Sequence, residues 1–305
     1  MELSQLVLLR ELAERGSITA VAQATARTPS AVSQQLRALQ RAAGQVLIVR
    51  EGRGVRLTEA GDALARASVR LATAMAQTEA EWQSWLGSPT GAVSLSVFPS
   101  VGELLLPGLL ARLRQWPGLE LTLIDNDVAQ PDFDALVNRA DIVLAHRGEV
   151  EDVRASHRLH QVTLFGEPVD LAVPRGHRFA LRASVRCAEV VDERWLGVPE
   201  AYPLDRLLEV VGQTAGRPVR VVWRSMDFGI LAALVAAGEG VCLLPRYCTD
   251  TAARGLRLVP ISDVTLVRRV EALARPDTAA RGAVGAVFQA LVDETARFRA
   301  DEPPQ

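Results

Sequence analysis

The sequence contains no lysine, because every one of its 34 basic residues is arginine. This absence excludes Schiff-base chemistry on a lysine and phosphate-binding loops that depend on one. Cysteine is scarce too: Cys187, Cys242 and Cys248 are too few and too odd in number for a disulfide framework. No run of about 18 apolar residues occurs, so the sequence predicts no membrane-spanning helix.

Other absences concern location and catalysis. The N-terminal stretch lacks the basic start and the unbroken apolar core of a signal peptide, since Arg10 and Glu11 interrupt it. We therefore expect a cytoplasmic protein with no membrane partner. The motifs of serine hydrolases and zinc peptidases, Gly-x-Ser-x-Gly and His-Glu-x-x-His, do not occur. We expect no enzymatic activity, no cofactor and no bound metal.

The charge of the chain is unevenly distributed. Its net charge is −2, yet residues 17–58 contain six arginines and one acid, Glu51, which leaves +5 in this stretch. Such a concentration indicates an anionic partner near the N-terminus. The length of 305 residues, with 49% hydrophobic and 23% charged residues, is typical of a globular chain of two or three domains.

Residues 3–43 predict three short helices separated by turn signals. Gly16 ends the first helix, Ser17 caps the second, and Thr28 followed by Pro29 starts the third. The short turn before the third helix gives a helix-turn-helix arrangement. In DNA-binding proteins of this kind, the second helix of the pair enters the major groove.

The helix predicted over residues 29–43 has two contrasting faces. Its apolar face carries Val32, Leu36 and Leu39, which we expect to pack on the rest of the domain. The opposite face holds hydroxyls, an amide and guanidinium groups but no acid, and such groups bind phosphates and read base edges. An ordinary solvated face would mix Glu with Arg, so we favour DNA binding. The residues of this face are Ser30, Ser33, Gln34, Arg37 and Arg41.

Two short apolar runs after this helix predict a β-hairpin with a glycine-containing tip. Arg50, Arg53 and Arg56 lie on or beside it, so the hairpin can place Arg53 against phosphates or in a minor groove. Two glycines of the tip also resemble the start of a dinucleotide-binding motif. Leu57 stands where that motif needs its third glycine, so we reject this alternative.

Residues 58–88 predict one long helix, with Thr58 as its N-cap and turn signals after Leu86. Apolar residues recur along it at the spacing of a heptad seam. A seam on a solitary helix has nothing to pack on, so we favour a dimerisation helix. Packing of the seam on the chain's own domain is the alternative. The seam consists of Leu64, Leu71, Met75 and Trp82.

From residue 91 onward, strands and helices alternate, which predicts an α/β domain over residues 91–300 with a parallel-rich sheet. The domain is long for one small sheet, so we expect two lobes. Lobe one should comprise residues 91–161 and 267–300, and lobe two residues 162–266.

Ligands of such lobed domains bind at the carboxyl ends of strands, in the crevice between lobes. Ser100 follows the first strand, where it can form a capping box with Glu103 or hold an anionic ligand at the helix N-terminus. Both alternatives stay open. His146 and Arg147 are the obvious positive groups at such a position. The candidate effector contacts are Ser100, Val101, Asn126, His146, Glu200, Ser225 and Met226.

Residues 1–61 resemble the winged helix-turn-helix domain of LysR-type transcriptional regulators. The matching stretches include TPSAVSQQLRALQ and RGVRLTEAG. The resemblance extends over the whole chain and implies a fold of α plus α/β type: a winged helix-turn-helix, a linker helix and a two-lobed effector domain like a periplasmic binding protein. It also implies DNA contacts from Thr28, Ser30, Ser33, Gln34 and Arg37, supported by Arg50 and Arg53.

The same resemblance implies a homodimer or a dimer of dimers, switched by a small-molecule effector between the lobes. We expect double-stranded DNA and RNA polymerase as partners. The sequence departs from the family pattern at Gln40, where an acid is usual, and at Ile48-Val49, where an aromatic residue and an acid are usual. A solute-binding protein would explain residues 91–300 but not the basic N-terminus, and an enzyme lacks a supporting motif.

Overall fold

The structure is a computed structural model that describes residues 1–52, 54–125, 136–148, 159–200, 202 and 204–299. Its contacts divide the chain into two compact units. The first contains residues 1–91 together with 275–285, and the second contains the remainder. Within the described part of the chain, no helix is long and apolar enough to cross a membrane.

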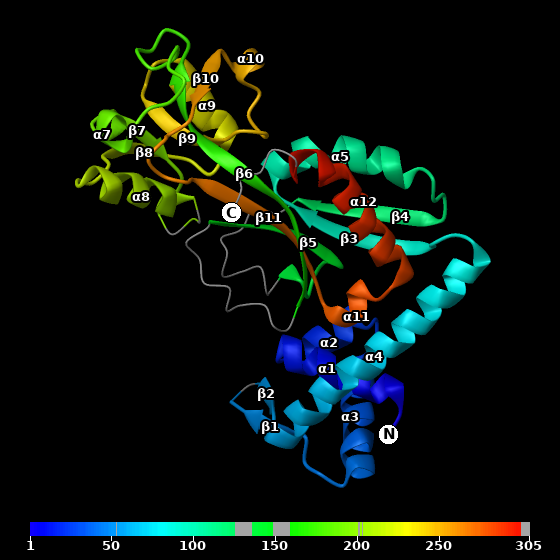
Figure 1. The fold of residues 1–305 in the computed structure, drawn as a ribbon. Helices are drawn as coiled ribbons and strands as arrows, with labels where there is room; N and C mark the ends of the chain where they lie inside the picture. The colour runs from blue at the N-terminus through cyan, green and yellow to red at the C-terminus, as the bar shows by residue number, and fades with distance from the viewer. Residues whose placement is uncertain (53, 126–135, 149–158, 201, 203, 300–305) are drawn as a thin grey trace. The chain divides into compact units, whose positions relative to one another are not determined.

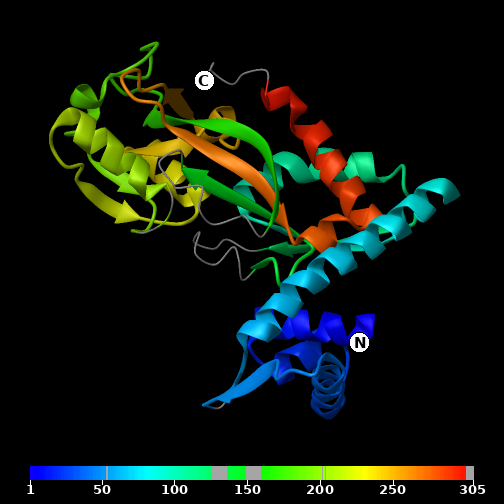
Figure 2. The same cartoon turned by 60° about the horizontal axis from the view of Figure 1, so that its bottom comes forward.

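The first unit begins with the predicted winged helix-turn-helix (Figures 1 and 2). Its helices end where local signals place their ends: Ser17 and Thr28 accept helix-capping hydrogen bonds, and Gly16 and Gly44 adopt positive φ after α1 and α3. The elements are α1 (Leu3–Arg15), α2 (Ile18–Ala24), α3 (Pro29–Ala43), β1 (Ile48–Glu51) and β2 (Gly54–Leu57). The sequence prediction of these elements is confirmed.

A long helix, α4 (Glu59–Leu86), follows the hairpin directly. The Thr58 hydroxyl accepts a hydrogen bond from the Gly61 N–H and donates one to the Val46 carbonyl at 2.7 Å. Gly61 is required here, because a Cβ at this position would overlap the carbonyl of Leu47. The start of α4 is therefore held against the segment that leads into β1.

The first unit also contains a cluster of partly buried ion pairs between α1 and the segment around α11 (Pro276–Ala279). On α1, the Glu11 carboxylate accepts from the Arg15 guanidinium at 2.8 Å and from Arg10 at 3.0 Å. Arg275 donates from one nitrogen, Nη1, to both Glu11 at 2.9 Å and Glu14 at 2.6 Å. We call these residues, together with Asp277, which pairs with Arg10 at 2.6 Å, the α1–α11 cluster.

In the second unit, nine strands of the described chain form one mixed sheet in the order β4-β3-β5-β11-β6-β9-β7-β8, with β10 pairing to β6. Parallel pairs occur within each lobe, but the central pairs are antiparallel, so the expected parallel-rich sheet is wrong. The strands are β3 (Gly91–Val97), β4 (Leu119–Asp125), β5 (Ile142–Gly148), β6 (His160–Pro174), β7 (Trp195–Gly197), β8 (Val221–Arg224), β9 (Val241–Pro245), β10 (Leu256–Val259) and β11 (Val267–Ala274).

Two long neighbouring strands, β6 and β11, connect the two lobes of this unit (Figure 1). In the sequence, the apolar runs over residues 162–165 and 169–174 each predict a strand, whereas β6 runs continuously through both. Its first part pairs with β11 and its second with β9 and β10, so one strand belongs to both lobes. The predicted lobe boundaries stay predictions, since the crossing strands leave no sharp division.

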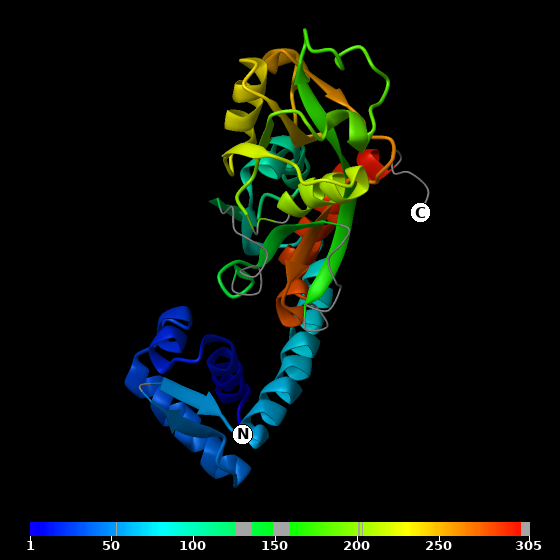
Figure 3. The same ribbon diagram turned by 90° about the vertical axis from the view of Figure 1, so that its left-hand side faces the viewer.

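Helices cover the sheet in both lobes (Figures 1 and 3). The sequence predicts a single helix over about residues 277–299, but the structure interrupts it between α11 and α12. It also predicts a helix near residues 131–138, most of which lies outside the described residues. The remaining helices are α5 (Pro99–Leu113), α7 (Cys187–Val190), α8 (Asp205–Ala215), α9 (Phe228–Ala236), α10 (Thr251–Arg254) and α12 (Gly282–Arg299).

The α1–α11 cluster makes the stability of the protein depend on acid pH. Burial opposes the charge of Glu11, but Arg275, Arg15 and Arg10 outweigh burial and lower its pKa from 4.5 to about 2. Because the folded state favours ionised Glu11, this stabilisation is present above pH 4.5 and is lost as the pH falls toward 2. The pKa difference corresponds to about 3 kcal/mol.

We predict that Glu11→Gln lowers the free energy of unfolding at pH 7 and removes much of its decrease between pH 4.5 and 2.5. Urea unfolding at a series of pH values measures both effects. Glu51→Gln is the control, because the Glu51–Arg56 pair on the hairpin is exposed. An unchanged pH dependence in Glu11→Gln would contradict this assignment.

Candidate DNA-binding surface and effector pocket

The outer face of α3 presents polar side chains to solvent. Val32, Leu36 and Leu39 are buried in the core of the winged domain, and this fixes which face of α3 points outward. Ser30, Gln34, Arg37 and Arg41 are exposed, and Ser33 is half-buried. Among the described residues, neither Arg37 nor Arg41 has a carboxylate partner, so both guanidinium groups are available to an anion.

All three of the predicted DNA-contact hydroxyls have local partners, and those of Thr28 and Ser30 lie 3.0 Å from each other. The Thr28 oxygen accepts from the Ala31 N–H at 3.2 Å, and the Ser33 hydroxyl donates to the Pro29 carbonyl at 2.9 Å. These bonds order the first turn of α3. Any phosphate contact from Thr28 or Ser33 would therefore use the remaining hydrogen-bonding capacity of each hydroxyl.

Gln40 stands where an acid is usual in the family pattern, and its side chain still holds the local fold. Its side-chain oxygen accepts the backbone N–H groups of Leu47 at 2.9 Å and Ile48 at 3.1 Å, where α3 meets the hairpin. A carboxylate can accept the same two bonds, so an amide replaces it without leaving the N–H groups unpaired.

The hairpin adds one described basic side chain to this surface. Arg50 is exposed on β1 and has no carboxylate partner among the described residues. Arg56 pairs with Glu51 at 3.3 Å. Arg53, the predicted residue of the hairpin tip, lies outside the described residues.

The four predicted seam residues of α4 have different surroundings. Leu64 packs against the core of the winged domain. Leu71, Met75 and Trp82 are 45%, 53% and 57% exposed, far more than apolar residues of a packed seam. Trp82 stacks on Trp85, with ring centroids 4.9 Å apart.

A pocket of about 290 Å³ lies between the two lobes of the second unit. Lobe one contributes the first turn of α5, and lobe two contributes the start of α9 and the segment before and in α10. The lining residues are Pro99, Ser100, Glu103, Met226, Asp227, Phe228, Gly229, Ala232, Cys248, Thr249 and Arg254. Of the predicted effector contacts, Ser100 and Met226 line this pocket.

Ser100 does not form the expected capping box. The N-cap of α5 is Phe98, and Ser100 lies inside the first turn. The Ser100 hydroxyl instead accepts a hydrogen bond from Arg268 Nη1 at 3.1 Å. Its position at the pocket therefore reflects a contact with a distant strand rather than a local cap.

Arg268 is buried beneath the pocket and was not anticipated from the sequence. It donates to the Glu167 carboxylate from Nε at 3.1 Å and to the Cys248 sulfur from Nη2 at 3.1 Å. Glu167 also accepts the backbone N–H groups of Tyr247 and Cys248. We call Arg268, Glu167, Ser100 and Cys248 the interlobe cluster. Its sequence signal is the pair of arginines, Arg268 and Arg269, near the start of a mostly apolar strand.

His146 is not the positive group that the sequence suggested. Its ring is fully buried and lies 2.9 Å from the Tyr202 hydroxyl. Burial, and secondarily the charge of Arg268, lower the pKa of His146 from 6.5 to about 3. The imidazole is therefore neutral at physiological pH and cannot attract an anion by charge.

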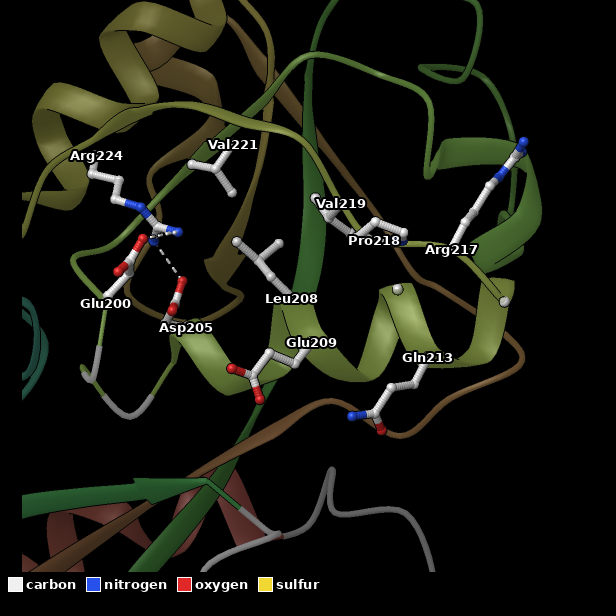
Figure 4. A pocket seen from close by; sticks show the side chains of 12 residues that line it. Glu200, Asp205, Leu208, Glu209, Gln213, Arg217, Pro218, Val219, Val221 and Arg224 are labelled. Carbon is white, nitrogen blue, oxygen red and sulfur yellow. Dashed lines mark hydrogen bonds and ion pairs between the residues drawn. The ribbon is translucent and has the colours of Figure 1, made fainter.

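The other predicted contacts lie away from the pocket. The Val101 side chain is buried in the core of lobe one, and Ser225 accepts a hydrogen bond from the Asp227 N–H at 3.2 Å. Glu200 lies in a separate groove of about 750 Å³ between α8 and β8, where it pairs with Arg224 at 3.4 Å (Figure 4). Asn126 lies outside the described residues.

Comparison with known proteins connects the two halves of the chain. Residues 3–62 match the family model of the bacterial regulatory helix-turn-helix protein, lysR family. Residues 86–296 match that of the LysR substrate binding domain. The chain belongs to the LysR family. It is therefore a transcriptional regulator with a helix-turn-helix and an effector-binding domain, not an enzyme.

Individual relatives of this LysR-type regulator are distant. The transcriptional dual regulator GltC of Bacillus subtilis is 27% identical, and the match covers 90% of this chain and 91% of GltC. OxyR of Escherichia coli is 28% identical over 80% of this chain and 79% of OxyR.

Solved structures share the fold. A full-length OxyR variant from Pseudomonas aeruginosa has a TM-score of 0.69 at 20% identity, covering 100% of this chain and 99% of that one. Full-length CbnR in complex with its target DNA has a TM-score of 0.53 at 20% identity, covering 95% and 100%.

Proposed function

We propose that this LysR-type regulator recognises a specific operator through the outer face of α3. The observation that carries the proposal is the exposed, acid-free surface of Ser30, Gln34, Arg37 and Arg41. Gln34 and Arg37 are suited to base edges, since amides and guanidinium groups bind adenine and guanine with paired hydrogen bonds. Thr28, Ser33, Arg41 and Arg50 contact phosphates, with Arg53 at the hairpin tip.

We predict that Gln34→Ala relaxes sequence preference and that Arg37→Ala weakens operator binding, each by about 1–3 kcal/mol. Fluorescence anisotropy with a duplex from the region upstream of the gene, and with base-substituted duplexes, measures both effects. Arg114→Ala is the control, because Arg114 is an exposed arginine just after α5. Wild-type affinity and selectivity in both α3 variants would rule out this surface.

We further propose that α4 joins two copies of the chain. Leu71, Met75 and Trp82 expose apolar surface along one helix, and a second α4 packed against them would remove that surface from water. The resulting homodimer, or a dimer of dimers, presents two copies of α3 to two half-sites. We expect it to act in the cytoplasm together with RNA polymerase.

We predict that Leu71→Glu yields monomers that bind operator DNA weakly, since it places an unpaired charge in the seam. Analytical ultracentrifugation gives the oligomeric state. Gln77→Glu is the matched control, because Gln77 is an exposed polar residue of the same helix and the new charge stays in water. A dimer of Leu71→Glu as stable as that of the control would exclude this seam.

We propose that a small-molecule effector binds in the pocket between the lobes. The pocket collects side chains from both lobes, so a ligand there would stabilise one relative position of the lobes over another. Ser100, with the N-terminus of α5, favours a group with anionic character. Met226 and Phe228 contribute apolar surface.

A thermal-shift screen of small carboxylic acids and amino acids would identify an effector. We predict that Ser100→Ala binds this effector about tenfold or more weakly than wild type, because the variant loses a charge-assisted hydrogen bond. Titration calorimetry measures that affinity. Ser84→Ala, at an exposed serine of α4, is the control. An effector bound equally by Ser100→Ala and wild type would remove Ser100 from the site.

Several relatives are named hydrogen peroxide-inducible genes activators, but the thiols of this chain do not favour peroxide as its signal. Reaction with peroxide needs a thiolate. Burial raises the pKa of the Cys248 thiol to about 12 despite the nearby Arg268, and it raises that of Cys187 to about 12. Cys242 is fully buried and its pKa is raised as well. A non-covalent ligand therefore agrees better with the pocket.

A further inference from the structure

Strand β11 carries an arginine of the interlobe cluster near one end and leads directly to an arginine of the α1–α11 cluster at the other. Arg268 is its second residue, and Arg275 follows its last residue, Ala274. The chain passes from the second compact unit to the first between Ala274 and Arg275. One short segment is thus bonded to the candidate effector pocket and to the DNA-binding domain.

The interlobe end of β11 senses the pocket directly. Arg268 is 1% exposed, and two of its partners, Ser100 and Cys248, line the pocket from opposite lobes. A ligand that displaces the Ser100 hydroxyl, or changes the distance between the lobes, must therefore change the hydrogen bonds of Arg268. Arg268 must keep these hydrogen bonds or replace them with others, because a buried guanidinium group without partners is strongly unfavourable.

The segment that follows β11 belongs to the first unit and is bonded to α1 there. Arg275 donates to Glu11 and Glu14 on α1, and Asp277 accepts from Arg10 at 2.6 Å. Helix α1 packs against α3 in the same core. A displacement of Arg275 would therefore pull on α1, and α1 supports the helix that we assign to the operator.

Between these ends, β11 is held on both sides. It pairs with β5 from Arg268 to Leu273 and with β6 from Val267 to Ala274. A strand that is hydrogen-bonded on both sides moves together with its two neighbours, since moving or bending it alone would break hydrogen bonds on both sides. The β11–β6 pair has one register shift, between Val270 and Glu271. The seven steps from Arg268 to Arg275 span about 23 Å.

We propose that β11 couples the interlobe pocket to the DNA-binding domain, with Arg275 as the positioning residue that transmits its shifts to α1. This coupling rests on the proposed function, because it links the proposed effector pocket to the proposed operator-binding helix. It also implies reciprocity: operator binding must alter the interlobe cluster as much as the cluster alters operator binding.

The Cys248 thiol provides a reporter at the pocket end. In a Cys187→Ala/Cys242→Ala background, a maleimide can label only Cys248. Labelling is slow because burial raises the pKa of this thiol, and its rate reports how far the interlobe cluster exposes the sulfur. We expect Arg275→Met to change this rate by about fivefold or more, the scale of ordinary allosteric coupling. Direct electrostatics cannot produce the change, because the separation of about 23 Å exceeds the Debye length of about 8 Å at physiological salt.

Three further variants separate coupling from a general loss of stability. Arg275→Lys should keep the wild-type rate, because one nitrogen of Arg275 meets both carboxylates and an ammonium can replace it. Arg112→Met, which breaks the Arg112–Glu294 pair away from β11, should also leave the rate unchanged. If Arg275→Met fails to fold by circular dichroism, Glu14→Gln removes one of the two partners and should change the rate in the same direction.

A second arm uses operator DNA as the ligand. Saturating upstream duplex should change Cys248 labelling in the wild type but not in Arg275→Met. Equal labelling of Arg275→Met and Arg112→Met without DNA would overturn the coupling, even if both bind the duplex. A wild-type protein that binds no duplex in a gel shift would overturn the proposed function, whereas the DNA-free comparison would still decide whether β11 couples the two clusters.

Discussion

Buried carboxylates need buried cations, and in this lysine-free chain arginine alone can supply them. Glu11, 5% exposed, accepts from Arg10, Arg15 and Arg275. Glu167, 0% exposed, pairs with Arg268. A carboxylate in such a position is stable only while its partners stay in place. The two clusters therefore fix where α1 meets the segment around α11 and where the crossing strands β6 and β11 meet the lobes.

The interlobe cluster also limits how an effector can act. Arg268 faces the rings of Phe98 in lobe one and Phe228 in lobe two, with 5.4 Å and 5.7 Å to the ring centroids. Both lobes thus contact one buried cation, which is neutralised by Glu167. An anionic ligand would not find a free charge there, and its recognition must come from Ser100, the α5 N-terminus and Arg254 at the rim.

The winged helix-turn-helix could be predicted from the sequence because its boundaries depend on local chemistry. Ser17, Thr28 and Thr58 cap helices through bonds from residues three positions further along the chain. The glycines after α1 and α3 adopt the positive φ that ends each helix. The outer face of α3 followed from helical periodicity alone.

The effector pocket could not be predicted to the same extent, because its contacts join residues far apart in the sequence. The sequence allowed Ser100 to be a helix cap, but its hydrogen-bond partner is Arg268, on a strand 168 residues further along the chain. His146 looked like a cation, but burial makes it neutral. No local pattern reveals burial by distant elements, which is also why the continuous β6 was expected as two strands.

If paired copies of α3 read an operator, hydroxyl-radical footprinting will show where each copy lies on the duplex. The full-length protein would be bound to DNA from the region upstream of its gene. We expect protection of two half-sites on one face of the duplex, with centres about 10 base pairs or a multiple of that apart. Absence of protection, or one uninterrupted protected stretch without that spacing, would contradict it.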